Sequence, residues 1–366
     1  MYVDNPEVTM DIEGHGIPSD AREAAFLDWL CSFVADGDDG KRYWFGCSPL
    51  VLVAEQVDLW HYEVTTETGG LKQIPGSVFK AADFPDVGLT GQEVHPAGSL
   101  DIDASDEAVV VTLGENFRVE IAPDHTWHYT LRDPENDFTA DFVHHGVGFP
   151  TWYGREKPSE LTQHSIAYGY NWSGRIEGTL TFGDKTVQVT GKGVRERYIA
   201  VDSSAAEIGG WEDWMWFHFD EAYGSLYEMK LGTKDQSLNL AEGNEFFPTG
   251  EFEIRHGDWA YLPSLGAFIP GEYRVILKVE AGVLDFTARP LGASVWGVTG
   301  ATPSTPVATL NWDTPTGTFT YNDGRVVELT NGKGGVSIRQ WQPYPNVVSP
   351  QFGAGQSDGL TRLATL

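Results

Sequence analysis

The middle of the chain holds a stretch whose residue types could do chemistry. Trp211-Glu-Asp-Trp-Met-Trp-Phe-His218 combines tryptophans, acids and a histidine within eight positions. On a strand, alternation places Trp214, Trp216 and His218 on one face and the intervening residues on the other. Aromatic faces beside a titratable group can stabilise positive charge on an apolar substrate. The alternative is ordinary core packing.

Acids near this stretch are candidate proton donors. Glu196 and Asp213 flank a short segment of small and acidic residues. A carboxyl in an apolar pocket has a raised pKa, because burial disfavours its ionised form, and it can then donate a proton near neutrality. We therefore expect Glu196, Asp213 and His218 to handle protons. The alternative for each acid is a surface carboxylate paired with Arg195 or Arg197.

Aromatic and histidine side chains upstream could line a substrate pocket. Tyr168 and Tyr170 alternate around a glycine just before Trp172, and His164 precedes them. They supply hydroxyls and an imidazole, or they merely pack. The predicted substrate-binding set is Tyr168, Tyr170, Trp172, Trp214, Trp216 and His164.

Motifs for other site classes are missing from the sequence. It has no Cys/His zinc spacing, no Gly-Lys-Ser/Thr phosphate loop and no Gly-x-Ser-x-Gly elbow. His144 and His145 are adjacent, and neighbouring residues of a strand face opposite ways, so they do not favour a shared metal. We therefore expect neither a metal nor a cofactor.

The charge balance is strongly acidic, with 53 Asp and Glu against 24 Lys and Arg and a net charge of -29. Such a surface repels phosphates and anionic lipid, which argues against nucleic-acid and membrane partners. No stretch approaches the roughly 18 apolar residues of a membrane span, and residues 1–16 lack the features of a signal peptide. A cytoplasmic location is expected, whereas the oligomeric state is not indicated.

Secondary structure is predicted to be one helix followed by many strands. An apolar run preceded by Ser19 and Asp20 predicts a helix over Ala21–Ala35. Short β-branched or aromatic segments bounded by turn residues predict strands. A hairpin with a Gly183-Asp184 turn is expected over Arg175–Arg195. The other predicted strands are Val51–Glu55, Leu59–Val64, Ala108–Leu113, Phe117–Ile121, Trp127–Leu131, Phe138–Val143, Phe252–Ile254, Arg274–Val279, Val283–Ala288, Thr318–Tyr321 and Val326–Leu329.

An internal repeat indicates that one β unit is duplicated. The hairpin sequence at 178–187 returns in similar form at 317–326. Four shorter matches keep the same order: Trp44-Phe45 with Trp216-Phe217, Tyr62-Glu63 with Tyr227-Glu228, Asp137–Ala140 with Asp285–Ala288, and Gly191–Gly193 with Gly332–Gly334. The boundary is expected within 199–210, which gives domains 1–205 and 206–366. Each half has a suitable length for an antiparallel barrel.

Three segments carry a resemblance to a known family: Gly174–Gly178, Gly191–Arg195 and Trp211–His218. The chain resembles the hydroxyneurosporene synthase superfamily, which includes carotenoid 1,2-hydratase, AttH-like proteins and lipocalin-type Diels–Alderases. The resemblance implies an all-β fold of two tandem lipocalin-like barrels, here with a short N-terminal helix. The family's glycine run commonly continues into Asp-His-Asn/Ser-Trp-Gly. This chain has Glu196-Arg-Tyr-Ile-Ala200 instead and keeps only the acid.

The resulting hypothesis is a cofactor-independent cyclase, isomerase or hydratase-type lyase. It would shape an apolar polyene or isoprenoid-like substrate in a barrel cavity near the domain junction and protonate or polarise it. The alternative is a lipocalin-like binding protein for a hydrophobic small molecule, which the missing Asp-His pair favours. A third possibility, a pair of barrels acting only as a scaffold, explains the tryptophan density poorly.

Overall fold

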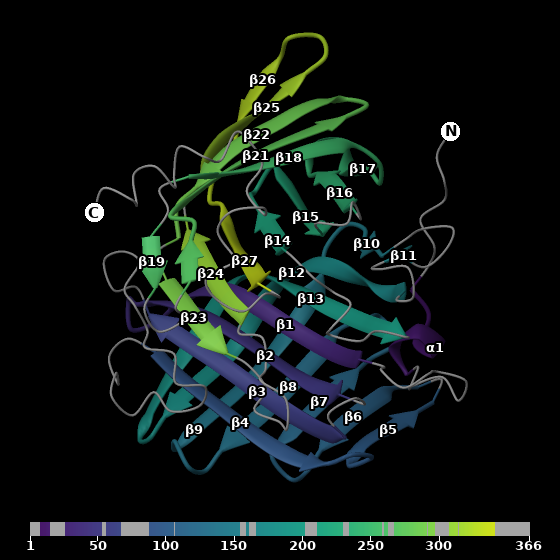
Figure 1. Cartoon of the computed structure of the whole chain (residues 1–366), viewed down its shortest axis with the longest axis vertical. Helices are drawn as coiled ribbons and strands as arrows, with labels where there is room; N and C mark the ends of the chain where they lie inside the picture. The colour runs from purple at the N-terminus through teal and green to yellow at the C-terminus, as the bar shows by residue number, and fades with distance from the viewer. Residues whose placement is uncertain are drawn as a thin grey trace. The chain divides into compact units, whose positions relative to one another are not determined.

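The structure is a computed structural model. It describes residues 8–14, 26–52, 56–66, 88–105, 107–153, 159–160, 166–201, 211–229, 234–257, 260–262, 267–290, 292–296, 307–313 and 315–340. Its regular secondary structure is β-strand, as the sequence predicts, apart from α1 (Met10–Glu13) and one 3-10 turn (Glu242–Asn244). The chain divides into two compact units. The first holds β1 to β13 and the second β14 to β27 (Figure 1).

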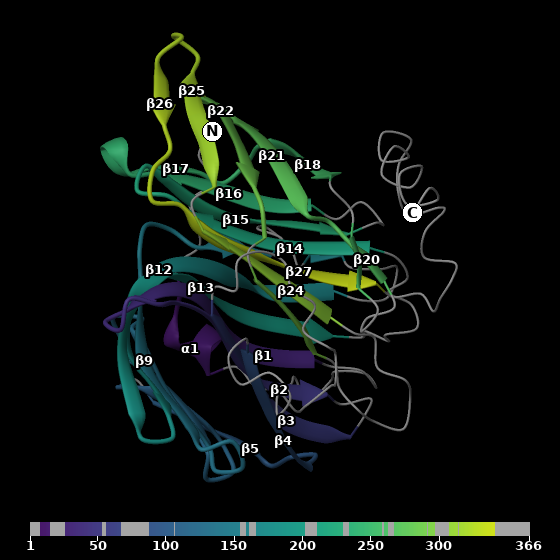
Figure 2. The same ribbon diagram turned by 90° about the vertical axis from the view of Figure 1, so that its left-hand side faces the viewer.

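Unit 1 is built on a single antiparallel sheet of 13 strands. Its order is β4-β3-β2-β1-β13-β12-β9-β8-β7-β6-β5, with β10 and β11 also paired to β12. Figure 2 shows how strongly this sheet curls. The strands are β1 (Phe26–Gly37), β2 (Arg42–Leu52), β3 (Val57–Thr66), β4 (Gly88–Pro96), β5 (Leu100–Ala104), β6 (Val109–Leu113), β7 (Phe117–Ile121), β8 (Trp127–Asp133), β9 (Phe138–Gly146), β10 (Thr151–Trp152), β11 (Ser159–Glu160), β12 (Ile166–Phe182) and β13 (Lys185–Val201).

In its described residues, unit 2 contains three sheets. Their orders are β17-β16-β15-β14-β27-β24-β23, β18-β21-β22-β25-β26 and β19-β20. The strands are β14 (Trp211–His218), β15 (Ala222–Met229), β16 (Lys234–Leu240), β17 (Glu245–Phe247), β18 (Glu251–Gly257), β19 (Ala260–Leu262), β20 (Ala267–Ile269), β21 (Glu272–Val279), β22 (Gly282–Ala288), β23 (Gly292–Trp296), β24 (Val307–Asp313), β25 (Thr316–Tyr321), β26 (Val326–Glu328) and β27 (Lys333–Gln340).

The helix predicted over 21–35 is wrong from Phe26 onward. Residues 26–37 form β1, which pairs with both β2 and β13, while 21–25 lie outside the described residues. A strand buried on both faces has a nearly continuous apolar sequence, which periodicity alone does not distinguish from a helix. Here Trp29 and Phe33 point into the core, and Val34, on the opposite face, is buried as well.

The predicted strands are confirmed, with small differences at their ends. The expected hairpin is formed by β12 and β13, which turn at Gly183 with a φ of 57°. Val51–Glu55 is confirmed only to Leu52, because residues 53–55 are not among those described.

The two units share one feature of pairing order, since the first strand of each pairs with its last: β1 with β13, and β14 with β27. Both Gly-Lys-Gly segments lie at these last strands. Two of the dipeptide matches lie in strands that do not hold the same position in the two units. Trp44-Phe45 lies in β2, whereas Trp216-Phe217 lies in β14, and Tyr62-Glu63 lies in β3, whereas Tyr227-Glu228 lies in β15. Among the described residues the unit 1 ladder runs from β4 to β5 without closing, so tandem barrels stay a prediction.

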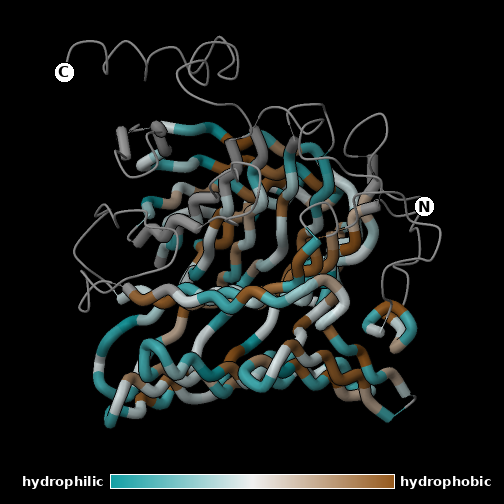
Figure 3. Tube along the Cα trace, turned by 60° about the horizontal axis from the view of Figure 1, so that its bottom comes forward, coloured by the Kyte–Doolittle hydropathy of each residue, from teal (hydrophilic) through white to brown (hydrophobic). Residues whose placement is uncertain are grey.

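Each unit has its own apolar core, made by alternate residues of its strands. Brown and teal alternate along many of the strands in Figure 3. The unit 1 core includes Trp29, Phe33, Phe45, Val119, Tyr129 and Phe142. The unit 2 core includes Met215, Phe217, Phe252, Tyr273, Phe286 and Trp312. Cys31 and Cys47 face each other across β1 and β2 as buried free thiols.

Replacing Phe33 by alanine tests the assignment of β1 as a core strand. Its ring lies 5.1 Å from both the Phe45 and the Phe142 ring centroids. We expect Phe33→Ala to lower the free energy of unfolding by about 3–5 kcal/mol. Asp36→Ala, at the exposed end of β1, should cost less than about 1 kcal/mol. Urea unfolding measures both changes, and equal costs would contradict the assignment.

Candidate functional site

Strand alternation separates the residues expected to form one site around β14. Asp213 shares a face with Met215 and Phe217, which belong to the unit 2 core. Trp216 and His218 point to the opposite face, as does Trp214, although all are buried. The predicted aromatic wall therefore does not line the interior that Asp213 faces.

Glu196 lies in a separate polar cluster of unit 1. On β13 it alternates with Arg195 and Arg197, so it points away from the interior that they face. The Tyr153 hydroxyl donates a hydrogen bond to Glu196 Oε1, and Asn171 Nδ2 donates to the Tyr153 hydroxyl at 2.7 Å. Glu196 is 7% exposed, so the alternative of a surface carboxylate does not hold for it.

The predicted substrate-binding residues of β12 have different environments. Tyr170 is fully buried and Trp172 partly buried, and both pack in the unit 1 interior. Tyr168, near the start of the strand, is 41% exposed. His164 lies outside the described residues.

Asp213 forms a buried pair with a histidine from another sheet. His256 Nε2 lies 2.8 Å from Asp213 Oδ2, and the side chains are 6% and 1% exposed. His256 comes from β18, where it alternates with the core residues Phe252 and Ile254. Tyr273 of β21 packs beside it, with ring centroids 5.3 Å apart. Burial and the nearby Asp213 charge raise the pKa of Tyr273 well above its usual value, so its hydroxyl stays protonated.

Several polar atoms of this cluster have no hydrogen-bond partner among the described residues. They are Asp213 Oδ1, the Tyr273 hydroxyl and Trp312 Nε1. The Trp312 ring lies 5.8 Å from the Tyr273 ring. Buried polar groups are nearly always hydrogen-bonded, and those that are not require an explanation. One carboxylate oxygen and two N–H or O–H donors thus have unused hydrogen-bonding capacity inside an apolar core.

The Asp213–His256 pair has the parts needed for acid–base chemistry. An ionised carboxylate that accepts a proton from Nε2 orients the imidazole. The neutral ring can then take a proton, and Asp213 stabilises the imidazolium that forms. Tyr273 can donate a hydrogen bond without ionising.

Sequence reasoning missed His256 and Tyr273. The available signal was alternation, because each continues the inward-facing row of its strand. The contact between His256 and Asp213 could not be predicted from the sequence, because the two residues are 43 positions apart in the chain.

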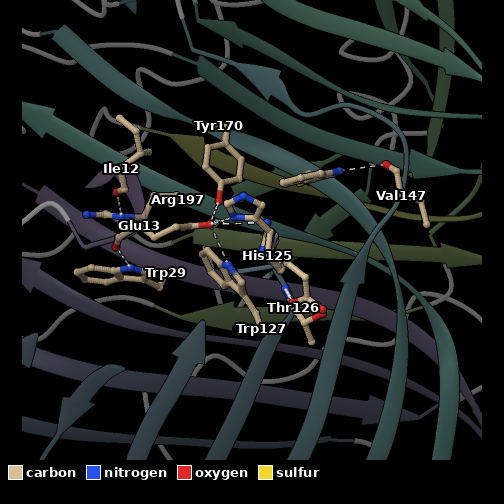
Figure 4. Close-up of polar contacts among 12 residues, drawn as sticks. Ile12, Glu13, Trp29, His125, Thr126, Trp127, Val147, Tyr170 and Arg197 are labelled. Carbon is tan, nitrogen blue, oxygen red and sulfur yellow. Dashed lines mark hydrogen bonds and ion pairs between the residues drawn. The ribbon is translucent and has the colours of Figure 1, made fainter. Parts of the chain in front are cut away.

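A second polar cluster lies inside unit 1 and was also missed (Figure 4). Glu13 of α1 is fully buried. Its Oε1 accepts hydrogen bonds from the Tyr170 hydroxyl at 2.5 Å and from Trp127 Nε1 at 3.2 Å. It lies 3.5 Å from His125 Nδ1 and 3.7 Å from Arg195 Nη2. Burial alone would raise the pKa of Glu13, but Arg195 and these hydrogen bonds outweigh it and lower the pKa.

Two arginines of β13 stack on tryptophans in this interior. The Arg195 guanidinium lies 4.4 Å from the Trp127 ring and 4.6 Å from the Trp172 ring. Arg197 lies 3.9 Å from the Trp29 ring, and it donates hydrogen bonds to the Ile12 and Asp28 carbonyl oxygens. Arg197 thereby ties α1 to β1.

Metal ligands and membrane spans were sought in the described part of the chain. It holds no group of three or more His, Cys, Asp or Glu placed to bind a metal ion. None of its helices is long and apolar enough to cross a membrane.

Solved structures with similar folds confirm the resemblance expected from the sequence. A putative AttH from Nitrosomonas europaea superposes with a TM-score of 0.62 at 15% identity, covering 93% of this chain and 99% of that one. Kievitone hydratase from Nectria haematococca superposes with a TM-score of 0.57 at 12% identity, covering 86% of this chain and 89% of that one. CghA with Sch210972 superposes with a TM-score of 0.57 at 12% identity, covering 89% of this chain and 94% of that one. The chain has an AttH-like fold.

Sequence comparison adds nothing to this: no protein-family profile and no curated protein matches the chain. At 11–15% identity the structural likeness establishes the fold alone. The function must therefore be argued from this chain's own residues.

The lowered pKa of Glu13 predicts a pH-dependent contribution to stability. A carboxyl with a depressed pKa stabilises the fold above its unfolded pKa of about 4.3, and this contribution is lost as the pH falls through the folded pKa. Glu13→Gln should cost about 3 kcal/mol at pH 7, because it leaves Arg195 as an uncompensated buried charge. The difference in the free energy of unfolding between Glu13→Gln and wild type should become smaller below about pH 4.

Urea unfolding from pH 7 down to pH 3 measures this effect. The exposed Glu115→Gln serves as the matched control and should track the wild type throughout. A Glu13→Gln deficit that stays constant down to pH 3 would show that the charge of Glu13 is not what stabilises the fold.

Proposed function

We propose that the protein is an enzyme that moves protons on an apolar small molecule in the interior of unit 2. The reaction classes are isomerisation, cyclisation and hydration or its reverse, on a polyene or isoprenoid-like substrate and without a cofactor. The observation that carries the proposal is the buried Asp213–His256 hydrogen bond, 2.8 Å long. The unpartnered Asp213 Oδ1 and Tyr273 hydroxyl lie in the same cluster.

His256 is the proton-transfer group of this proposal. In an isomerisation, neutral His256 takes a proton from one carbon and the imidazolium returns it to another, with no net change in protons. In a hydration, the imidazolium gives its proton to one alkene carbon, the oxygen of water bonds to the other, and the neutral imidazole takes back the proton that this water loses. Asp213 holds and balances the imidazolium, and Tyr273 donates a hydrogen bond to a substrate oxygen. The surrounding apolar side chains exclude water, which strengthens these electrostatic interactions.

Of the three residues expected to handle protons, the proposal retains Asp213. His218 points away from the core that Asp213 faces, and Glu196 belongs to the Tyr153 cluster of unit 1. The similar structures support the reaction class by analogy. One is a hydratase by name and another was solved with the compound Sch210972.

A non-catalytic binding protein is the second candidate. The unpartnered polar atoms near Asp213 favour it as much as they favour an enzyme, because they would also hold the polar group of a bound molecule. Turnover distinguishes the two candidates.

Activity should depend on Asp213 and His256. Purified protein is incubated with geraniol, retinol and squalene, and products of equal mass or of added or lost water are followed by mass spectrometry. We expect wild type to convert at least one compound, and Asp213→Asn and His256→Gln to lose about 100-fold or more in rate.

The matched controls in unit 1 are Asp101→Asn, at an exposed residue, and His128→Gln, whose side chain is 45% exposed. Both should keep wild-type rates. Binding without conversion would favour the second candidate. Conversion that survives undiminished in both site variants would refute the assigned roles.

A further inference from the structure

The Arg195 guanidinium in unit 1 is buried with unused hydrogen-bonding capacity. It is fully buried, and the Trp127 and Trp172 rings lie 4.4 and 4.6 Å from it. Its Nη1 donates to the His125 carbonyl oxygen at 2.6 Å. Its Nε and Nη2 make no hydrogen bond with any described residue. Nε and Nη2 together form the edge that binds a carboxylate through two parallel hydrogen bonds.

The Glu13 carboxylate lies near this edge of Arg195 but makes no hydrogen bond with it. Its Oε1 stays 3.7 Å from Arg195 Nη2, beyond hydrogen-bond length. Its Oε2 is buried and makes no hydrogen bond with any described residue. A buried carboxylate and a buried guanidinium thus lie side by side, and each has hydrogen-bonding atoms that the other does not satisfy. Leaving such groups unsatisfied costs free energy.

The segment that brings Glu13 to Arg195 is a single turn of helix near one end of the chain. Val8, Met10 and Ile12 pack against the unit 1 core. The Trp29 indole and Arg197 also bind the carbonyl oxygens of Glu13 and Ile12. Chemically, residues 8–13 present an apolar body that ends in a carboxylate. A molecule able to replace this segment would share that chemistry.

We propose that Arg195, with Trp127, Trp172 and Tyr170, forms a binding site for an amphipathic carboxylate. In this structure the chain's own Glu13 occupies it. A ligand with an apolar chain and a carboxylate displaces residues 8–14, makes the two hydrogen bonds on Nε and Nη2 that Glu13 does not, and accepts the Tyr170 hydrogen bond. This site is in unit 1 and is independent of the reaction proposed for unit 2.

The test compares dodecanoate with dodecanol, which has the same chain but no carboxylate. Binding is followed by calorimetry below the micelle concentration, and hydrogen exchange of residues 8–14 reports displacement of the segment. Dodecanoate should bind at least about tenfold more tightly than dodecanol and should speed exchange in 8–14. Glu13→Gln should bind dodecanoate about tenfold more tightly than wild type, because an internal competitor lowers apparent affinity.

Arg195→Lys keeps the positive charge but loses the planar fork, so it should bind dodecanoate about tenfold more weakly. Glu115→Gln is the control and should bind as wild type does. If Arg195→Lys does not fold, the Glu13→Gln comparison still decides. Equal affinity for dodecanoate and dodecanol, unchanged affinity in Glu13→Gln, or unchanged exchange of residues 8–14 would each overturn the proposal.

Discussion

The two-residue alternation of β-strands decides which side chains of this protein can act together. On β14 it sends Asp213 into the core with Met215 and turns His218 the other way. On β13 it sends Arg195 and Arg197 inward and Glu196 outward. Residues that are neighbours in sequence are therefore separated by the sheet. Residues that are far apart in sequence, such as Asp213 and His256, converge.

Both units place ionisable groups inside apolar cores, but they stabilise them differently. In unit 1 the Glu13 carboxylate lies beside an arginine that is in contact with two tryptophan rings. In unit 2 Asp213 pairs with a histidine, a residue type that both donates and accepts protons in catalysis. An arginine keeps its charge and suits anchoring. The histidine pair therefore suits proton transfer, and the arginine cluster suits the binding of an anion.

Much of the fold could be predicted from local sequence. Short segments such as Phe117–Ile121 carry the alternation and turn residues that define strands, and they are strands. The error at β1 has a physical cause: both of its faces are buried, so its sequence lost the period that marks a strand. The AttH-like fold followed from the pattern of glycine and tryptophan segments at the centre of the chain.

The candidate sites were harder to predict from the sequence, because they depend on contacts between segments that are far apart in the chain. Asp213 could be singled out as an acid near an aromatic segment, but its partners come from β18 and β21. Glu13 is one acid among 53 Asp and Glu residues. Nothing in its surroundings in sequence indicates that it meets Arg195. The first pairing depends on how two sheets pack together and the second on how α1 packs against a sheet, and local sequence patterns encode neither.

The central claim is that the substrate is bound beside Asp213 in the interior of unit 2. Methyl-¹³C labelling of methionine tests it directly, because Met215 lies two residues from Asp213 on the same face and Met10 packs in unit 1. The labelled protein is titrated with whichever compound of the geraniol, retinol and squalene panel it converts fastest. The account predicts that the Met215 methyl resonance shifts and that of Met10 does not. A shift of Met10 with Met215 unchanged would contradict it.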